Sequence, residues 1–232
     1  MTGTLIKSGR DGSMNNLAKP NRRQVLELCI SRGLLAVAAG GVLSPRQLFA
    51  AWQQVEQRAL QPTPHEAFGP LFIKGAPNQR VLRAPSDPGV PLKLSGRVLN
   101  TSGQVVEAAV FDFWQADHRG LYDTRGYRYR TRFTPGETGK YGIDTVIPGH
   151  YPDRPAQHLH YMVAAPGHRT LVTESYFATD PFFEGNLDKN WNKDGIVEHK
   201  EMILPVRLIE DASAQSQSLH AEITLDIVLE KV

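Results

Sequence analysis

From residue 62 onward the chain carries short runs of alternating apolar and polar residues, separated by turns rich in glycine and proline. A side-chain period of two is the pattern of a strand with one buried face. The runs cover 92–99, 105–114, 127–133, 141–147, 158–165, 170–177, 201–208 and 220–230. About eight or nine mostly antiparallel strands with almost no helix predict an all-β fold, a β-sandwich. We expect 92–99 and 105–114 to form a hairpin, and the polar stretch 179–195 to hold no regular element.

The first 50 residues differ in charge from the rest of the chain. They hold seven Lys/Arg against two Asp/Glu, which leaves 19 basic and 22 acidic residues for the remainder. This mildly acidic body gives nucleic-acid binding no electrostatic support. The only cysteine, Cys29, lies in the leader, so the body can form no disulfide and use no thiol nucleophile.

The leader has the features of an export signal. Arg22-Arg23 precede a weakly hydrophobic run, 33–43, and small residues at 50–51. A basic region, an apolar core and a small-residue exit are typical of secretory signals, and the arginine pair is typical of the twin-arginine type. Residues 1–51 are therefore predicted to direct export to the periplasm, with an ordinary N-terminal helix as the alternative. No later segment is long and apolar enough to span a bilayer.

Two histidines, His158 and His160, lie in an apolar, β-prone run. Residues i and i+2 of a strand share a face, so both imidazoles project together while Leu159 points away. Paired histidines on a rigid strand form half of a typical transition-metal site. The preceding turn adds Tyr151, a candidate anionic ligand, and Arg154, a fixed positive charge. Taken alone, the pair also fits two polar residues on the wet face of a strand.

Single residues elsewhere receive structural interpretations. Trp114 is expected in the core, and His150 and His168, which lie in turns, in solvent. The Asp and Asn residues of 180–194 miss the spacing of a calcium loop, so no calcium site is predicted there.

Several short motifs follow one another along most of 62–180. They are Thr63-Pro64 with Gly69-Pro70-Leu71-Phe72, Ser95-Gly96-Arg97-Val98, Phe113-Trp114-Gln115-Ala116-Asp117, Gly120-Leu121-Tyr122, Gly139-Lys140-Tyr141, Pro148-Gly149-His150-Tyr151, and Arg154 to His160. Their order and spacing resemble the intradiol ring-cleavage dioxygenases, the non-haem ferric enzymes related to protocatechuate and catechol dioxygenases.

The resemblance implies an Fe(III) site made of two tyrosinates and two histidines. Tyr122 matches the tyrosine of Gly-x-Tyr, and Tyr151 matches that of Pro-Gly-x-Tyr. His158 and His160 match the histidine pair. By the family pattern, Tyr151 is the ligand displaced by substrate while Tyr122 stays on the metal. Arg154 resembles the arginine beside the histidines, whose charge is expected to stabilise negative charge on the ring.

The chemistry explains this ligand set. Two phenolates are hard, strongly donating anions that hold iron as Fe(III), and neutral imidazoles complete the site without adding charge. A phenol with a pKa of about 10 is protonated at neutral pH, so the cation must drive its ionisation. The resemblance implies chelation of a catechol-type substrate and insertion of both atoms of O2, giving a muconate-type diacid. It leaves homo-oligomerisation open, because no helical dimerisation segment follows the leader.

Two departures from the family pattern bear on substrate and activity. Gln157 makes the gap between arginine and histidines one residue longer, so either a bulge absorbs it or Gln157 takes part of the place of Arg154. Glu174 stands where glutamine is usual. A carboxylate near the site would repel a catecholate unless it is paired or turned away.

Two other protein classes stay open. The region 95–141 also resembles transthyretin-like sandwiches, which are binding or structural modules, although these lack the downstream tyrosine and histidine pair. A cupin also uses His-x-His with a nearby glutamate, but Glu174 lies far along the sequence from the pair. The sequence therefore predicts an export signal at 1–51 and an intradiol dioxygenase-like catalytic domain at 52–232.

Overall fold

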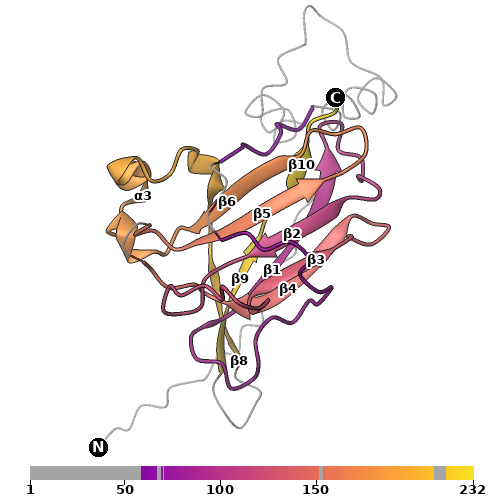
Figure 1. Cartoon of the computed structure of the whole chain (residues 1–232). Helices are drawn as coiled ribbons and strands as arrows, with labels where there is room; N and C mark the ends of the chain where they lie inside the picture. The colour runs from indigo at the N-terminus through magenta and orange to yellow at the C-terminus, as the bar shows by residue number, and fades with distance from the viewer. Residues whose placement is uncertain (1–58, 67–68, 70, 152–153, 212–217) are drawn as a thin grey trace, which may run out of the picture. The chain divides into compact units, whose positions relative to one another are not determined.

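The computed structural model describes residues 59–66, 69, 71–151, 154–211 and 218–232. The predicted export signal lies outside these residues and stays a prediction. The described residues form ten strands in two five-stranded sheets, with helix limited to a few short turns (Figure 1). The predicted all-β sandwich is therefore confirmed. None of the helices in this part of the chain has the length and hydropathy to cross a membrane.

The first sheet contains β1 (Pro91–Asn100), β4 (Lys140–Val146), β8 (Arg207–Asp211), β9 (Ser218–Thr224) and β10 (Ile227–Leu229). The second sheet runs in the order β3 (Arg130–Phe133), β2 (Val110–Trp114), β5 (His158–Ala164), β6 (Leu171–Phe177) and β7 (Ile203–Leu204). Five strand pairs are antiparallel, and three are parallel: β1–β9, β1–β10 and β6–β7.

The stretch 179–195 was predicted to be without regular structure, and this is wrong. It contains three short helices, with a fourth just beyond it: η1 (Pro181–Phe183), α3 (Leu187–Asn190), η2 (Lys193–Gly195) and η3 (Lys200–Met202). They follow β6 along the chain and lie beside the second sheet, near the label of α3 in Figure 1. The first begins because Asp180 accepts a hydrogen bond from the Phe182 N–H and a proline follows the cap. Helices this short carry no periodic pattern for the sequence to show.

The predicted hairpin of 92–99 with 105–114 is also wrong, because β1 and β2 belong to different sheets. The segment directly after β1 turns back and pairs with β1 through one isolated bridge, between Leu99 and Val105. Ala108 then takes a left-handed backbone conformation, with φ of 53°, and the chain continues into the second sheet. Alternation indicates which side chains are buried, but not which sheet buries them.

The core between the sheets centres on Phe111 of β2. Its ring centroid lies 4.9 Å from that of Phe133 and 5.8 Å from that of Tyr161, both in the same sheet. It also lies 4.7 Å from the ring centroid of Tyr141 on β4 of the first sheet. Phe111 therefore joins the two layers, and Leu159 of β5 is fully buried in the same cluster.

Replacing Phe111 with alanine is expected to lower the free energy of unfolding by about 3–5 kcal/mol, because it leaves a cavity between the sheets. Chemical denaturation measures this change. The control is Leu208→Ala on β8, a side chain that is 57% exposed, which should stay within about 0.5 kcal/mol of wild type. Equal losses in the two variants would contradict a core centred on Phe111.

Candidate metal centre

His158 and His160 project from β5 on the side away from the inter-sheet core. Their ring centroids are 4.7 Å apart. Both side chains are nonetheless buried, at 3% and 0% exposure, because loops cover this outer face of the sheet. The interpretation as polar residues on a wet strand face is therefore excluded.

Each of the two predicted tyrosine ligands faces one of these histidines. The hydroxyl of Tyr122 lies 2.9 Å from Nε2 of His160, and the hydroxyl of Tyr151 lies 3.1 Å from Nε2 of His158. The two tyrosine rings are 5.8 Å apart. The structure thus brings together all four side chains predicted to bind the metal, from three separate parts of the chain.

The two loops that carry the tyrosines are locked to each other. In the first loop, one carboxylate oxygen of Asp117 accepts hydrogen bonds from the Arg119 and Leu121 N–H groups, at 2.8 and 3.0 Å. Gly120 has φ of +80°, and a Cβ there would lie 2.0 Å from the carbonyl oxygen of His150 in the second loop. The glycine is required both by the backbone conformation and by this close approach.

Both histidines are held neutral. Nδ1 of His158 lies 2.7 Å from the carbonyl oxygen of Ala156, which places the proton on Nδ1 and the lone pair on Nε2. Burial lowers the pKa of His158 to about 4, with a further lowering from the charge of Arg154. Burial also lowers the pKa of His160 well below its ordinary value, helped by the nearby His158 and Arg154. Neutral imidazoles with Nε2 toward the tyrosines are suited to bind a metal.

The hydroxyl of Tyr122 needs a cation in order to ionise. Burial raises the pKa of Tyr122 above its ordinary value, and the neighbouring Tyr151 raises it further. The charge of Arg154 lowers this pKa, and so does that of Arg130, a buried guanidinium 6.0 Å from the Tyr122 ring centroid. Two phenols and two neutral imidazoles meeting at one point fit Fe(III), because the cation would displace the phenolic protons and the phenolates would neutralise its charge.

A carboxylate also lies beside the histidines. One ligand atom from each of His158, His160 and Glu174 falls within a group spanning 4.8 Å, a set that resembles a two-histidine, one-carboxylate site. However, the Glu174 carboxylate is 3.3 Å from Nδ1 of His160, whereas the tyrosine hydroxyls face the Nε2 atoms. The carboxylate therefore lies behind the ring, and one metal ion cannot use both sides of His160.

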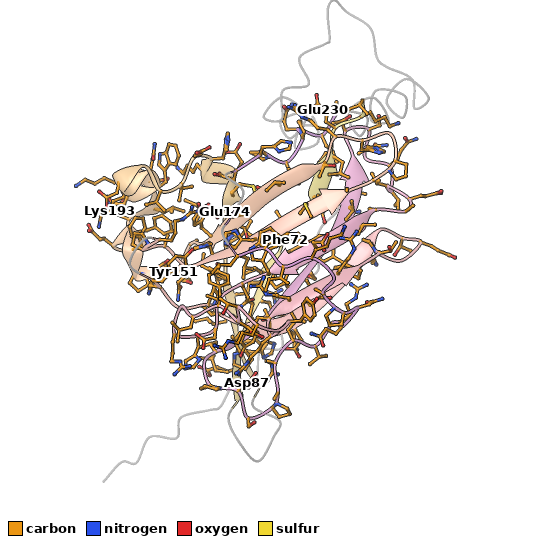
Figure 2. All side chains as sticks on the ribbon, viewed as in Figure 1. Phe72, Asp87, Tyr151, Glu174, Lys193 and Glu230 are labelled. Carbon is orange, nitrogen blue, oxygen red and sulfur yellow. The ribbon has the colours of Figure 1, made fainter. Side chains whose placement is uncertain are left out.

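Glu174 corrects an argument made from the sequence. Its distance along the sequence predicts that it lies away from the histidines, unlike the glutamate of a cupin. Strands β5 and β6 are antiparallel neighbours with His160 opposite Glu174, so the residue is adjacent in space. Figure 2 shows Glu174 and Tyr151 on the same side of the molecule, far from Glu230.

Arg154 is committed to that carboxylate. The backbone N–H of Arg154 donates to the carbonyl of Tyr151 at 3.0 Å, so the turn brings the two residues together. The side-chain Nη2 of Arg154 donates to Oε1 of Glu174 and to the Tyr176 hydroxyl. Glu174 is therefore paired, which is the condition under which it would not repel a catecholate. The charge of Arg154 is correspondingly balanced.

Gln157 does not take the place of Arg154. Its side-chain amide donates to the carbonyl oxygen of Pro148 at 2.9 Å, and its backbone N–H donates to Asp180 at 2.6 Å. The same buried carboxylate lies 2.8 Å from Nε2 of His150, whose side chain is 43% exposed, so His150 is solvated as expected and also contacts Asp180. The extra residue thus ties the tyrosine-bearing loop to the segment after β6.

Two neighbours of His160, Trp114 and Gly69, shape its surroundings. Trp114 is buried, as expected, and it stacks on the His160 ring with centroids 5.0 Å apart and an interplanar angle of 12°, outside the cluster between the sheets. Gly69 lies so close to the imidazole of His160 that a Cβ at this position would be 2.1 Å from Cε1 of the ring. The alternation of β2, with Phe111 and Phe113 inward, could have placed Trp114 on the histidine side.

A family model described as "Dioxygenase" matches residues 67–231. The chain belongs to the intradiol ring-cleavage dioxygenase family. The dioxygenase domain of a dioxygenase and carbohydrate-binding protein fusion from Streptomyces sp. SirexAA-E is 32% identical, with a TM-score of 0.60, and the match covers 74% of this chain and all of that one.

Curated relatives in this dioxygenase family are similar over shorter spans. Catechol 1,2-dioxygenase of Acinetobacter baylyi is 30% identical over 148 residues, which is 52% of this chain and 48% of the relative. 6-Chlorohydroxyquinol 1,2-dioxygenase of Cupriavidus pinatubonensis is 29% identical over 186 residues, 69% of this chain and 66% of the relative. The chain thus spans about half to two thirds of the length of these relatives.

Replacing Gly69 with alanine should displace His160, because the new methyl group would overlap the imidazole. We expect Fe(III) affinity to fall by about 10- to 100-fold, the usual effect of misplacing a ligand's support. Metal competition titration measures the affinity. The control is Gly136→Ala, where the new methyl group has nothing within 4 Å and affinity should not change. A Gly69→Ala protein with wild-type affinity would contradict the close packing.

The metal-free protein should lose stability in acid. In the folded state His158 has a pKa of about 4, against an ordinary value of 6.5, so the unfolded chain binds the extra proton first. The free energy of unfolding should therefore fall as pH drops from 6.5 toward 4, by up to about 3 kcal/mol for this residue. Urea denaturation between pH 7 and pH 4 checks this.

In this experiment His158→Gln should reduce the pH slope, while His220→Gln on β9 should keep it. A His158→Gln variant with the wild-type slope would show that His158 is not held neutral by folding.

Proposed function

We propose that the protein is a non-haem Fe(III) intradiol dioxygenase that cleaves a catechol-type aromatic with O2 to a muconate-type diacid. The observation that carries the proposal is the pairing of each buried histidine Nε2 with one tyrosine hydroxyl. The relatives named catechol and hydroxyquinol 1,2-dioxygenases support this substrate class. Iron bound by Tyr122, Tyr151, His158 and His160 would supply Lewis acidity toward a catecholate.

The two tyrosines are proposed to have different roles. Tyr122 is assigned as the permanent ligand by the family pattern, and the charges of Arg154 and Arg130 both favour its phenolate form. Tyr151 is assigned as the ligand that yields to substrate, and its released phenolate would accept a proton from a catechol hydroxyl at its own oxygen. The proton then stays inside the site, where burial disfavours separated charges.

Arg154 is proposed to stabilise negative charge that develops on the ring. Its Nη2 is fixed by Glu174 and Tyr176, so the guanidinium is held in place without having to be ordered by substrate. Because Glu174 balances its charge, the arginine contributes less net positive potential than a free guanidinium would.

Export by the twin-arginine route is part of the proposal. It is supported by Arg22-Arg23 and the weakly apolar run that follows them. This route carries folded proteins, which suits a domain that acquires its metal before leaving the cytoplasm. Self-association of identical chains is also proposed, without a specified interface.

The experiment is a visible absorption spectrum of the ferric-loaded protein before and after adding catechol, followed by O2 uptake. We expect a tyrosinate-to-iron band that shifts with catechol, then O2 consumption and a muconate-type product. Tyr122→Phe should reduce turnover by about 100-fold or more, because a phenolate ligand is lost. Tyr127→Phe, whose hydroxyl donates to the carbonyl of Lys74 at 3.2 Å, is the matched control and should retain activity.

A protein that stays colourless after ferric loading would overturn the enzyme proposal. The alternative, a non-catalytic transthyretin-like binding module, would then be preferred, since that class needs the sandwich but not the tyrosine and histidine ligands.

A further inference from the structure

Two buried polar atoms face each other behind His160. Nδ1 of His160 and Oε2 of Glu174 are 3.3 Å apart, and both side chains are 1% exposed. Within the described residues neither atom has a hydrogen-bond partner. A buried donor or acceptor left unpaired is costly, so each of these atoms is the available partner of the other.

The carboxylate is held in this position from two directions. The ladder between β5 and β6 places Glu174 directly opposite His160. The other carboxylate oxygen, Oε1, accepts hydrogen bonds from Nη2 of Arg154 and from the Tyr176 hydroxyl. With Oε1 bonded to these two partners, Oε2 faces Nδ1 of His160.

The imidazole is confined as well. Trp114 stacks on it at 5.0 Å, and Gly69 leaves no room for a methyl group beside Cε1. Its Nε2 lies 2.9 Å from the Tyr122 hydroxyl. The ring therefore has an acceptor on its Nδ1 side and the metal-facing phenol on its Nε2 side.

We propose that Glu174 is a positioning residue that accepts the Nδ1–H of His160 and thereby commits Nε2 to the metal. The inference rests on the iron site proposed above. A neutral imidazole carries one proton, so holding that proton on Nδ1 leaves the lone pair on Nε2. A carboxylate acceptor also makes the imidazole a stronger donor to the metal.

The two histidines are then not equivalent. His158 donates its Nδ1–H to a neutral backbone carbonyl, that of Ala156. His160 donates to a charged carboxylate, which is a stronger acceptor. The glutamine usual in the family would offer only a neutral amide oxygen here, so the stronger donation through His160 is a property of this chain.

The first test uses the metal-free protein and so does not depend on iron. Long-range ¹H–¹⁵N correlation spectra report which imidazole nitrogen carries the proton. We expect His160 in the wild type to be protonated on Nδ1, and Glu174→Gln to shift it toward a mixture of the two tautomers. A wild-type His160 protonated on Nε2 would overturn the inference.

The second test uses the ferric protein. Glu174→Gln weakens donation from His160, which leaves Fe(III) more electron-poor. We expect the tyrosinate-to-iron band to move to lower energy, the Fe(III)/Fe(II) potential to become more positive, and Fe(III) affinity to fall by about 10- to 100-fold. The matched control is Glu198→Gln, an exposed carboxylate whose charge acts on the same Tyr176. It should leave the band, potential and affinity unchanged.

The variant Tyr176→Phe distinguishes a general disturbance of this buried cluster from the specific loss of the carboxylate beside His160. This variant removes one hydrogen bond to Oε1 but keeps the carboxylate opposite His160, so the band should stay in place. If the wild type binds iron and Glu174→Gln has the same band, potential and affinity, the positioning role of Glu174 is overturned and the proposed function still stands. Wild type that binds no iron would refute the proposed function, while the tautomer measurement would still decide the contact between Glu174 and His160.

Discussion

The candidate site depends on the pairing of β5 with a strand on each side. Its hydrogen bonds to β2 and β6 fix the register, so the alternation of its side chains cannot drift. Leu159 enters the core, and His158 and His160 project from the opposite face. A slip of one residue would exchange these faces and move the histidines into the apolar core. The rigid ladder thus supplies half of the ligand set at fixed separation.

The rest of the site consists of loops folded over that face. Asp117 organises the loop before Tyr122, and Asp180 ties the loop after Tyr151 to the segment beyond β6. Each loop is held by a buried carboxylate that accepts hydrogen bonds from backbone N–H groups. A carboxylate is a stronger acceptor than a neutral group. The scaffold can therefore place half-buried tyrosines at defined positions on irregular segments.

Charge balance makes such burial affordable in free-energy terms. Several of the described ionisable groups near the metal position are paired with a group of opposite charge or are held neutral, and one buried cation lies beside a tyrosine ring. Arg154 is paired with Glu174, the two imidazoles are neutral, and Arg130 lies beside the Tyr122 ring. Burial raises the pKa of the Tyr122 phenol, so this phenol needs a cation in order to ionise. This arrangement is consistent with membership of a family of metal-dependent dioxygenases, and it explains how an added carboxylate can be accommodated near the site.

The sequence by itself determined the all-β class, the outward projection of the two histidines and the family, because each follows from local period or from the order of motifs along the chain. It also identified Tyr122, Tyr151 and Arg154 as candidates, through the resemblance. Only the tertiary structure decided the contacts between segments distant in sequence. In the folded protein β1 and β2 belong to different sheets, Trp114 stacks on His160, and Glu174 lies beside Nδ1 of His160. Alternation specifies a face but not the neighbouring strand, and strand order is set by packing across the whole sandwich.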